Sequence, residues 1–152
     1  MEILIYPHEG LRQVCEPVAA VTAVLQRQIS EMLALMYERK GVGLAAPQVG
    51  IPLRMLVMNV TIDPEQKEHE HVFINPVIKH RIGGRTAIEE GCLSLPGDFG
   101  KVVRSKKVKF QAYRPNGSTV DTTWSGLGAR MLQHEVDHLD GILFIDRLQE
   151  DE

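Results

Sequence analysis

The sequence predicts an α+β fold, with mostly antiparallel sheets around a late helix that carries metal-ligand residue types, and one early packing helix. Short apolar or alternating runs of strand type, separated by turn residues, fill the middle of the chain. Helical spacing of apolar residues occurs towards the two ends. With 152 residues, 43% of them hydrophobic, the chain suffices for one core, so we expect a single domain over residues 1–152.

The bulk properties argue against several classes of function. A net charge of -3 provides no basic field that would attract nucleic acid or an anionic membrane. No apolar run approaches the roughly 20 residues that span a bilayer, and residues 1–7 lack the features of a signal peptide. The two cysteines, Cys15 and Cys92, are too few for a disulfide scaffold. We therefore expect a cytoplasmic protein without direct nucleic-acid or membrane partners.

An amphipathic helix is the first regular element that we expect. Thr22 is a suitable N-cap, and the basic residues 39–40 followed by Gly41 are a stop signal. Between them, apolar residues recur at spacings of three and four, which predicts a helix packed along one side. These residues are Leu25, Ile29, Met32, Leu33 and Met36.

Several strands should follow, after a run of small residues at 41–50 that contains the polar Gln48. That run suits either a tight loop or a segment lying against a ligand, and its pattern does not choose between them. We expect turns at residues 75–76 and 83–84, and a last hairpin with a basic solvent face. The expected strands are residues 53–60, 72–74, 77–82, 106–113 and 118–124.

The last predicted helix starts at Ser125 or Gly126 and contains the sequence His-Glu-x-x-His. At roughly 100° per residue, His134 and His138 lie about 40° apart around the helix axis, so both can reach one metal ion. Glu135 is placed to act as the base of a metal-assisted hydrolysis. A catalytic site of the zinc type takes three protein ligands and keeps one open position. A third ligand is therefore required from elsewhere.

A second concentrated stretch, residues 89–97, contains Cys92 directly after two acids and a glycine. This cysteine can be an inert core thiol, a nucleophile or a metal ligand, and the local pattern leaves all three open. The neighbouring Glu89 and Glu90 oppose formation of a thiolate unless a cation is bound. A metal ion is such a cation, because coordination deprotonates the thiol.

Three stretches together, residues 41–48, 90–94 and 133–138, resemble the signature motifs of bacterial-type peptide deformylases. They occur in the family's order and at its approximate spacing, and the resemblance extends over nearly the whole chain. It implies one divalent metal ion with water in the fourth position, commonly Fe(II) in vivo, with Zn(II) or Ni(II) as alternatives. The implied ligands are Cys92, His134 and His138.

The activity implied by the resemblance is removal of the formyl group from the N-terminal formyl-methionine of newly made polypeptides, with release of formate. Glu135 would act as general base and then general acid. The side-chain amide of Gln48 and the backbone N–H of Leu93 would stabilise charge on the formyl oxygen. The backbone at Gly43 and Gly91 would bind the peptide in an extended form. The expected methionine pocket is formed by Val42, Leu127 and Met131, with Arg130 at its rim.

Two other functions fit the helix motif. A metallopeptidase uses the same His-Glu-x-x-His pattern, and a non-enzymatic domain can hold a structural metal. Structural sites usually close all four positions, whereas the three strong candidates here favour an open site. Nascent N-formyl-methionyl peptides are the expected partners, and the short tail after Leu148 leaves transient ribosome contact open. Residues 98–101 depart from the family pattern, in which an arginine often follows the cysteine motif.

Overall fold

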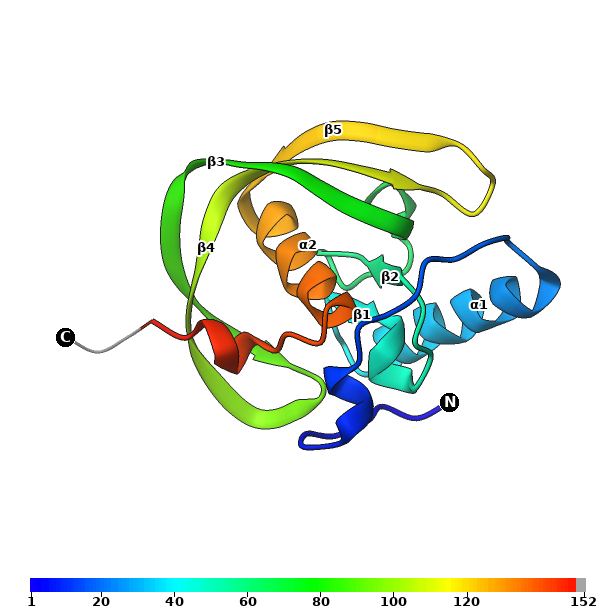
Figure 1. Cartoon of the computed structure of the whole chain (residues 1–152), viewed down its shortest axis with the longest axis horizontal. Helices are drawn as coiled ribbons and strands as arrows, with labels where there is room; N and C mark the ends of the chain where they lie inside the picture. Colours follow the sequence, from blue (N-terminus) through cyan, green and yellow to red (C-terminus); the bar gives the residue numbers. More distant parts are fainter. Residues whose placement is uncertain (150–152) are drawn as a thin grey trace.

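A computed structural model describes residues 1–149 and, within them, five strands and two α-helices (Figure 1). The strands form one antiparallel sheet in the order β1-β2-β3-β4-β5. The α+β prediction, with an early and a late helix, is thus confirmed. The elements are α1 (Ala23–Glu38), β1 (Gly43–Ala45), β2 (Met55–Met58), β3 (His71–Cys92), β4 (Leu95–Tyr113), β5 (Thr119–Ser125) and α2 (Gly126–Leu139).

Helix α1 forms where the sequence predicts it and packs against β1 and β2. The Thr22 hydroxyl caps it by accepting a hydrogen bond from the Leu25 N–H at 3.1 Å. Leu35 is buried, whereas the predicted Leu33 is only half-buried, because the contact with the sheet lies on the Leu35 side of the helix. The buried partners of α1 include Leu44, Met55, Val57 and Ile74.

Strand β3 is one continuous element, and the predicted turn at residues 75–76 is wrong. Asn75 has a φ of 51°, which asparagine tolerates better than most residues, and the register of β3 against β4 shifts after Ile74. A bulge of this kind bends a strand without reversing the chain. The Asn75 side chain accepts a hydrogen bond from the Val18 N–H at 2.8 Å and donates one to the Val18 carbonyl at 3.0 Å. The bend therefore also anchors the N-terminal segment.

The glycine pair at residues 83–84 forms another bulge and does not end the strand as predicted. Gly83 and Gly84 have φ values of 79° and 78°, a region that glycine enters without a steric penalty. Strand β3 then pairs with β4 as far as Cys92, and β4 begins well before the predicted residue 106. The two long strands curve past α2 (Figure 1). Their tight connection at Leu93 and Ser94 brings Cys92 towards that helix.

Helix α2 lies at the centre of the molecule and is buried from Ala129 to Leu139. Its apolar side packs in the core that contains the aromatic rings of β3, β4 and β5. The centroids of Phe73 and Phe110 are 5.4 Å apart, and those of Phe110 and Trp124 are 5.0 Å apart. A helix buried on all sides holds its polar residues in fixed positions, which suits a catalytic constellation.

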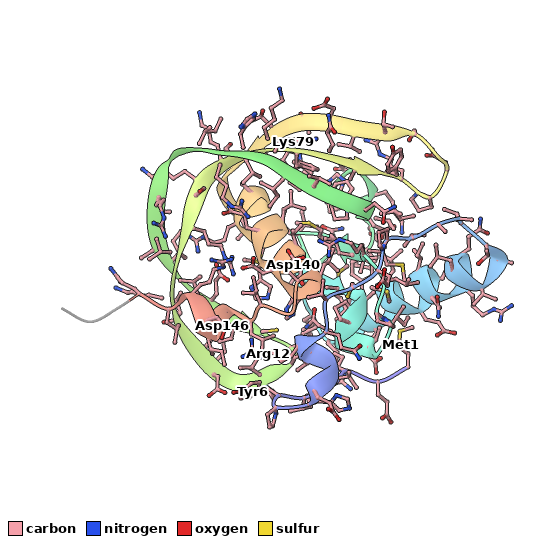
Figure 2. The ribbon with its side chains drawn as sticks, viewed as in Figure 1. Met1, Tyr6, Arg12, Lys79, Asp140 and Asp146 are labelled. Carbon is pink, nitrogen blue, oxygen red and sulfur yellow. The ribbon has the colours of Figure 1, made fainter. Side chains whose placement is uncertain are left out.

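Two short helices near the ends of the described chain, residues 9–12 and 144–147, meet beside α2. The short helix Glu9–Arg12 places the guanidinium of Arg12 against the carboxylate of Asp146, in the short helix Phe144–Arg147 (Figure 2). Arg12 also donates a hydrogen bond to the carbonyl of Gly141 at 3.1 Å. None of the helices formed by residues 1–149 is long and apolar enough to cross a membrane. The assignment of residues 1–152 to a single domain stays a prediction.

Replacing Phe110 with alanine should lower the free energy of unfolding by about 3–5 kcal/mol, because the ring is fully buried among aromatic neighbours. Tyr113→Ala on the same strand is the control, since its side chain is exposed and its loss should change stability by no more than about 0.5 kcal/mol. Urea unfolding monitored by circular dichroism measures both. Similar losses in the two variants would show that the aromatic core does not stabilise the fold.

Candidate metal centre

The two histidines of α2 project towards the same point, as their spacing predicts. His134 and His138 are buried, and their ring centroids are 5.1 Å apart. Glu135, between them in sequence, is also buried, and its Oε1 lies 3.9 Å from His138 Nε2. Helix α2 therefore presents two imidazoles and one carboxylate to a common space.

Cys92 reaches this space from the end of β3. Its Sγ lies 3.5 Å from His138 Nε2. One ligand atom each from Cys92, His134 and His138 can be chosen so that all three lie within 4.8 Å of one another. The structure thus brings together the three residues that the sequence resemblance implies as ligands.

The buried carboxylate of Glu90 fixes the orientation of His134. Its Oε1 lies 2.9 Å from His134 Nδ1, which leaves Nε2 of the imidazole free for a metal ion. Arg104 binds the same carboxylate through two contacts, Nε to Oε2 at 2.7 Å and Nη2 to Oε1 at 3.0 Å. Burial opposes the charged form, but the hydrogen bonds from His134 and Arg104 lower the pKa of Glu90 to about 2. Glu90 is therefore an anion at neutral pH.

Arg130 belongs to this network and does not line the cavity beside the candidate metal ligands, so the expectation that it lies at the rim of that pocket is corrected; it lines the separate hollow that contains Leu127. Its guanidinium is buried and contacts Glu90 Oε2 at 2.6 Å. It also donates to the carbonyls of Val102 at 3.0 Å and Thr86 at 2.8 Å. Helical position alone could not reveal this role, because all three partners lie on β3 and β4.

Asp137 joins the network from the same side of α2 as Arg130, seven residues earlier, and was not singled out in the sequence. It accepts hydrogen bonds from Arg104 Nη1 at 3.0 Å and from Arg147 Nε at 2.7 Å. The signal in the sequence that could have identified Asp137 is its position inside the His-Glu-x-x-His motif. The two arginines connect α2 to β4 and to the C-terminal short helix.

Gln48 directs its side-chain amide towards the candidate metal ligand Cys92. Its Oε1 accepts a hydrogen bond from the Ala45 N–H at 2.9 Å, which orients the side chain. The Nε2 group therefore faces the other way, 3.5 Å from Cys92 Sγ and 3.1 Å from Ser94 Oγ. Gln48 is buried and belongs to the short helix Ala46–Val49, so this donor is held in place.

Glu135 has the properties of a proton acceptor. Its Oε1 is buried and has no hydrogen-bond partner among residues 1–149. Burial raises the pKa of Glu135 to about 7, against the opposing effect of His134. Gly43 makes room for it, since a Cβ added there would lie 2.5 Å from Glu135 Oε2. The small residue at this point of β1 is thus required by the approach of the carboxylate.

A cavity of about 400 Å³ opens beside these groups. Leu127 lies outside this cavity, 52% exposed in the first turn of α2, where it lines a different hollow with Ile88. Sequence reasoning did not select Arg39, Lys40 or Phe99, which also line the cavity. The site residues that the sequence predicted and that do line the cavity are Val42, Gly43, Gln48, Gly91, Cys92, Leu93, Met131, His134 and Glu135.

The donor set fits a divalent transition metal. One thiol sulfur and two imidazole nitrogens suit iron, zinc or nickel. Burial lowers the pKa of His138 well below its usual value, which keeps this imidazole neutral and able to coordinate. The unpartnered Glu135 Oε1 beside the ligands is consistent with an additional group in this space.

Known proteins match the chain over almost its full length. The family model described as polypeptide deformylase matches residues 1–152. A peptide deformylase from Chromobacterium violaceum is 44% identical over 99% of this chain and 87% of its own. One from Rhodopirellula baltica is 46% identical over 99% of this chain and 74% of its own.

Solved structures agree with the sequence matches. Peptide deformylase from Plasmodium falciparum superposes with a TM-score of 0.93 at 40% identity, covering 98% of this chain and 87% of that one. Peptide deformylase from Thermotoga maritima superposes with a TM-score of 0.91 at 38% identity, covering 98% of this chain and 97% of that one. Since the family model matches residues 1–152 and these relatives match nearly the whole of this chain, the chain belongs to the peptide deformylase family.

Proposed function

We propose that the centre formed by α2 and the end of β3 carries out the reaction of peptide deformylases. This reaction is the hydrolytic removal of the formyl group from the N-terminal formyl-methionine of newly made polypeptides. The observation that carries the proposal is the convergence of Cys92, His134 and His138 beside the buried carboxylate of Glu135. Peptide deformylases are metalloenzymes, so a metal-assisted hydrolysis is the chemistry expected of this centre.

Cys92, His134 and His138 would hold one divalent metal ion, Fe(II) in vivo by resemblance, with Zn(II) and Ni(II) as alternatives. When bound, such an ion polarises the reacting carbonyl and lowers the pKa of water towards neutrality. The protein contributes the orientation of its ligands, since the contact between Glu90 and His134 selects which imidazole nitrogen faces the site.

Glu135 is the proposed general base and later general acid. Its buried position beside the ligands lets it accept a proton from the attacking water and pass that proton to the leaving amine. A pKa near 7 suits both steps, because the carboxylate can take up a proton and release it at cellular pH.

Gln48 and Leu93 are the proposed donors to the formyl oxygen, which gains negative charge as the bond to water forms. The Gln48 amide is held towards Cys92 by its contact with the Ala45 N–H. The backbone N–H of Leu93 belongs to the tight connection between β3 and β4, at the edge of the cavity. Donors fixed before the reaction stabilise this charge without reorganisation.

The substrate would bind as an extra extended strand. Strand β1 is an edge of the sheet, so Gly43 can offer its backbone to a peptide, and Gly91 lies on the other wall of the cavity. Val42 and Met131 provide apolar surface for the methionine side chain. We infer that nascent formylated peptides in the cytoplasm are the substrates, while ribosome contact stays open.

An assay with a formyl-methionyl tripeptide tests this function. Metal-loaded protein prepared without oxygen should release one formate for each new N-terminal amine. A metallopeptidase with the same helix motif would instead cleave an unblocked peptide at internal bonds. Internal cleavage without formate release would contradict the proposal.

Glu135→Ala should retain the metal and lose turnover by at least about 100-fold, because the variant keeps all three ligands and lacks the proton carrier. Metal content and formate release are measured on the same sample. Glu89→Ala is the matched control, an exposed acid next to the network. Cys92→Ala should lose both metal and turnover. Loss of metal in Glu135→Ala, or normal turnover with metal retained, would contradict the assigned role.

A further inference from the structure

A second cavity of about 390 Å³ lies between the middle of β3 and β4 and the helix α2. It shares no lining residue with the cavity at the metal centre. Four arginines line it, Arg81 and Arg85 from β3, Arg104 from β4 and Arg147 from the C-terminal short helix. Such a concentration of guanidinium groups contrasts with the net charge of -3 for the whole chain.

Two of the four arginines are already paired with carboxylates. Arg147 is paired with Asp137, and Arg104 is paired with both Asp137 and Glu90. The other two, Arg81 and Arg85, make no side-chain hydrogen bond or ion pair with any part of the chain between residues 1 and 149. Among residues 1–149, the cavity thus has two positive charges without a carboxylate partner, beside the polar side chains of Gln133 and Asp137.

The glycine bulge places these two arginines around the cavity. Between Ile82 and Arg85, strand β3 has one more residue than the facing segment of β4, and such bulges redirect neighbouring side chains. Gly84 lines the cavity, and a Cβ added there would meet no atom within 4 Å. Ser105 pairs with Arg85 across the ladder and adds a hydroxyl to the lining. The backbone at the mouth is therefore open to a ligand.

We propose that this cavity binds a small dianion of the phosphate class, such as a phosphate monoester, through Arg81 and Arg85. The planar guanidinium matches phosphate oxygens with paired hydrogen bonds, which a lysine cannot reproduce. A phosphate monoester carries about -1.5 to -2 charges at neutral pH, which balances the charges of Arg81 and Arg85, the two arginines without a partner in the described part of the chain. The cavity is also larger than a phosphate group, so it has room for a small organic substituent.

Titration calorimetry of the metal-loaded full chain with inorganic phosphate, at constant ionic strength, tests the proposal. Arg81→Ala/Arg85→Ala should weaken phosphate binding by about tenfold or more, because both charge-assisted contacts are lost. Lys79→Ala/Lys109→Ala is the matched control. It removes two exposed charges from the same pair of strands outside the cavity, and its affinity should stay within about twofold of wild type.

Three results would overturn the proposal. The first is absence of phosphate binding by the wild-type chain at millimolar concentration. The second is unchanged binding in Arg81→Ala/Arg85→Ala, which would place the anion elsewhere, including at the metal centre. The third is an equal loss of phosphate affinity in the two double variants, which would indicate general electrostatic attraction of the anion. Circular dichroism of each variant shows whether it is folded, and both pairs are exposed, so neither should unfold the chain.

Discussion

The fold and the metal centre both depend on the buried carboxylate of Glu90. It is held by Arg104 of β4 and by Arg130 and His134 of α2, so a single anion joins three elements. A buried charge is costly unless all its partners are in place. The network is therefore complete only when the two long strands have closed over α2. The same closure creates the candidate active site.

Strand geometry links this network to the third ligand. Glu90 and Cys92 are two residues apart on β3, and alternate residues of a strand share a face. Glu90 therefore contacts His134 at Nδ1, the nitrogen that points away from the site. Cys92 directs its sulfur into the site, towards His138 Nε2. Arg104 extends the arrangement further, because it also contacts Asp137 and lines the arginine-rich cavity. One guanidinium thus lies between the metal centre and the proposed anion site.

The sequence predicted the parts of this protein that local patterns determine. The Thr22 cap, the start of α2 at Gly126 and the convergence of His134 and His138 follow from helix geometry and capping chemistry. The resemblance to the family supplied Cys92, because residues 89–97 alone left three roles open for it.

The remaining features depend on contacts between distant segments. The continuity of β3 through Asn75 and the glycine pair could not be predicted, because those residues are equally typical of turns. The burial of Arg130 and Asp137 depends on carboxylates and arginines supplied by other elements. Leu127 has suitable helical spacing, but the direction of α2 against the sheet places it in another hollow.

Metal affinity in a Glu90→Gln variant tests most directly whether this carboxylate holds the centre together. Glutamine keeps the shape but removes the charge that orients His134 and pairs with two arginines. We expect metal binding weaker by about 10–100-fold in a chelator competition, because the group that orients a metal ligand is lost. Glu89→Gln, the exposed neighbour, should bind normally. Wild-type affinity in folded Glu90→Gln would contradict the account.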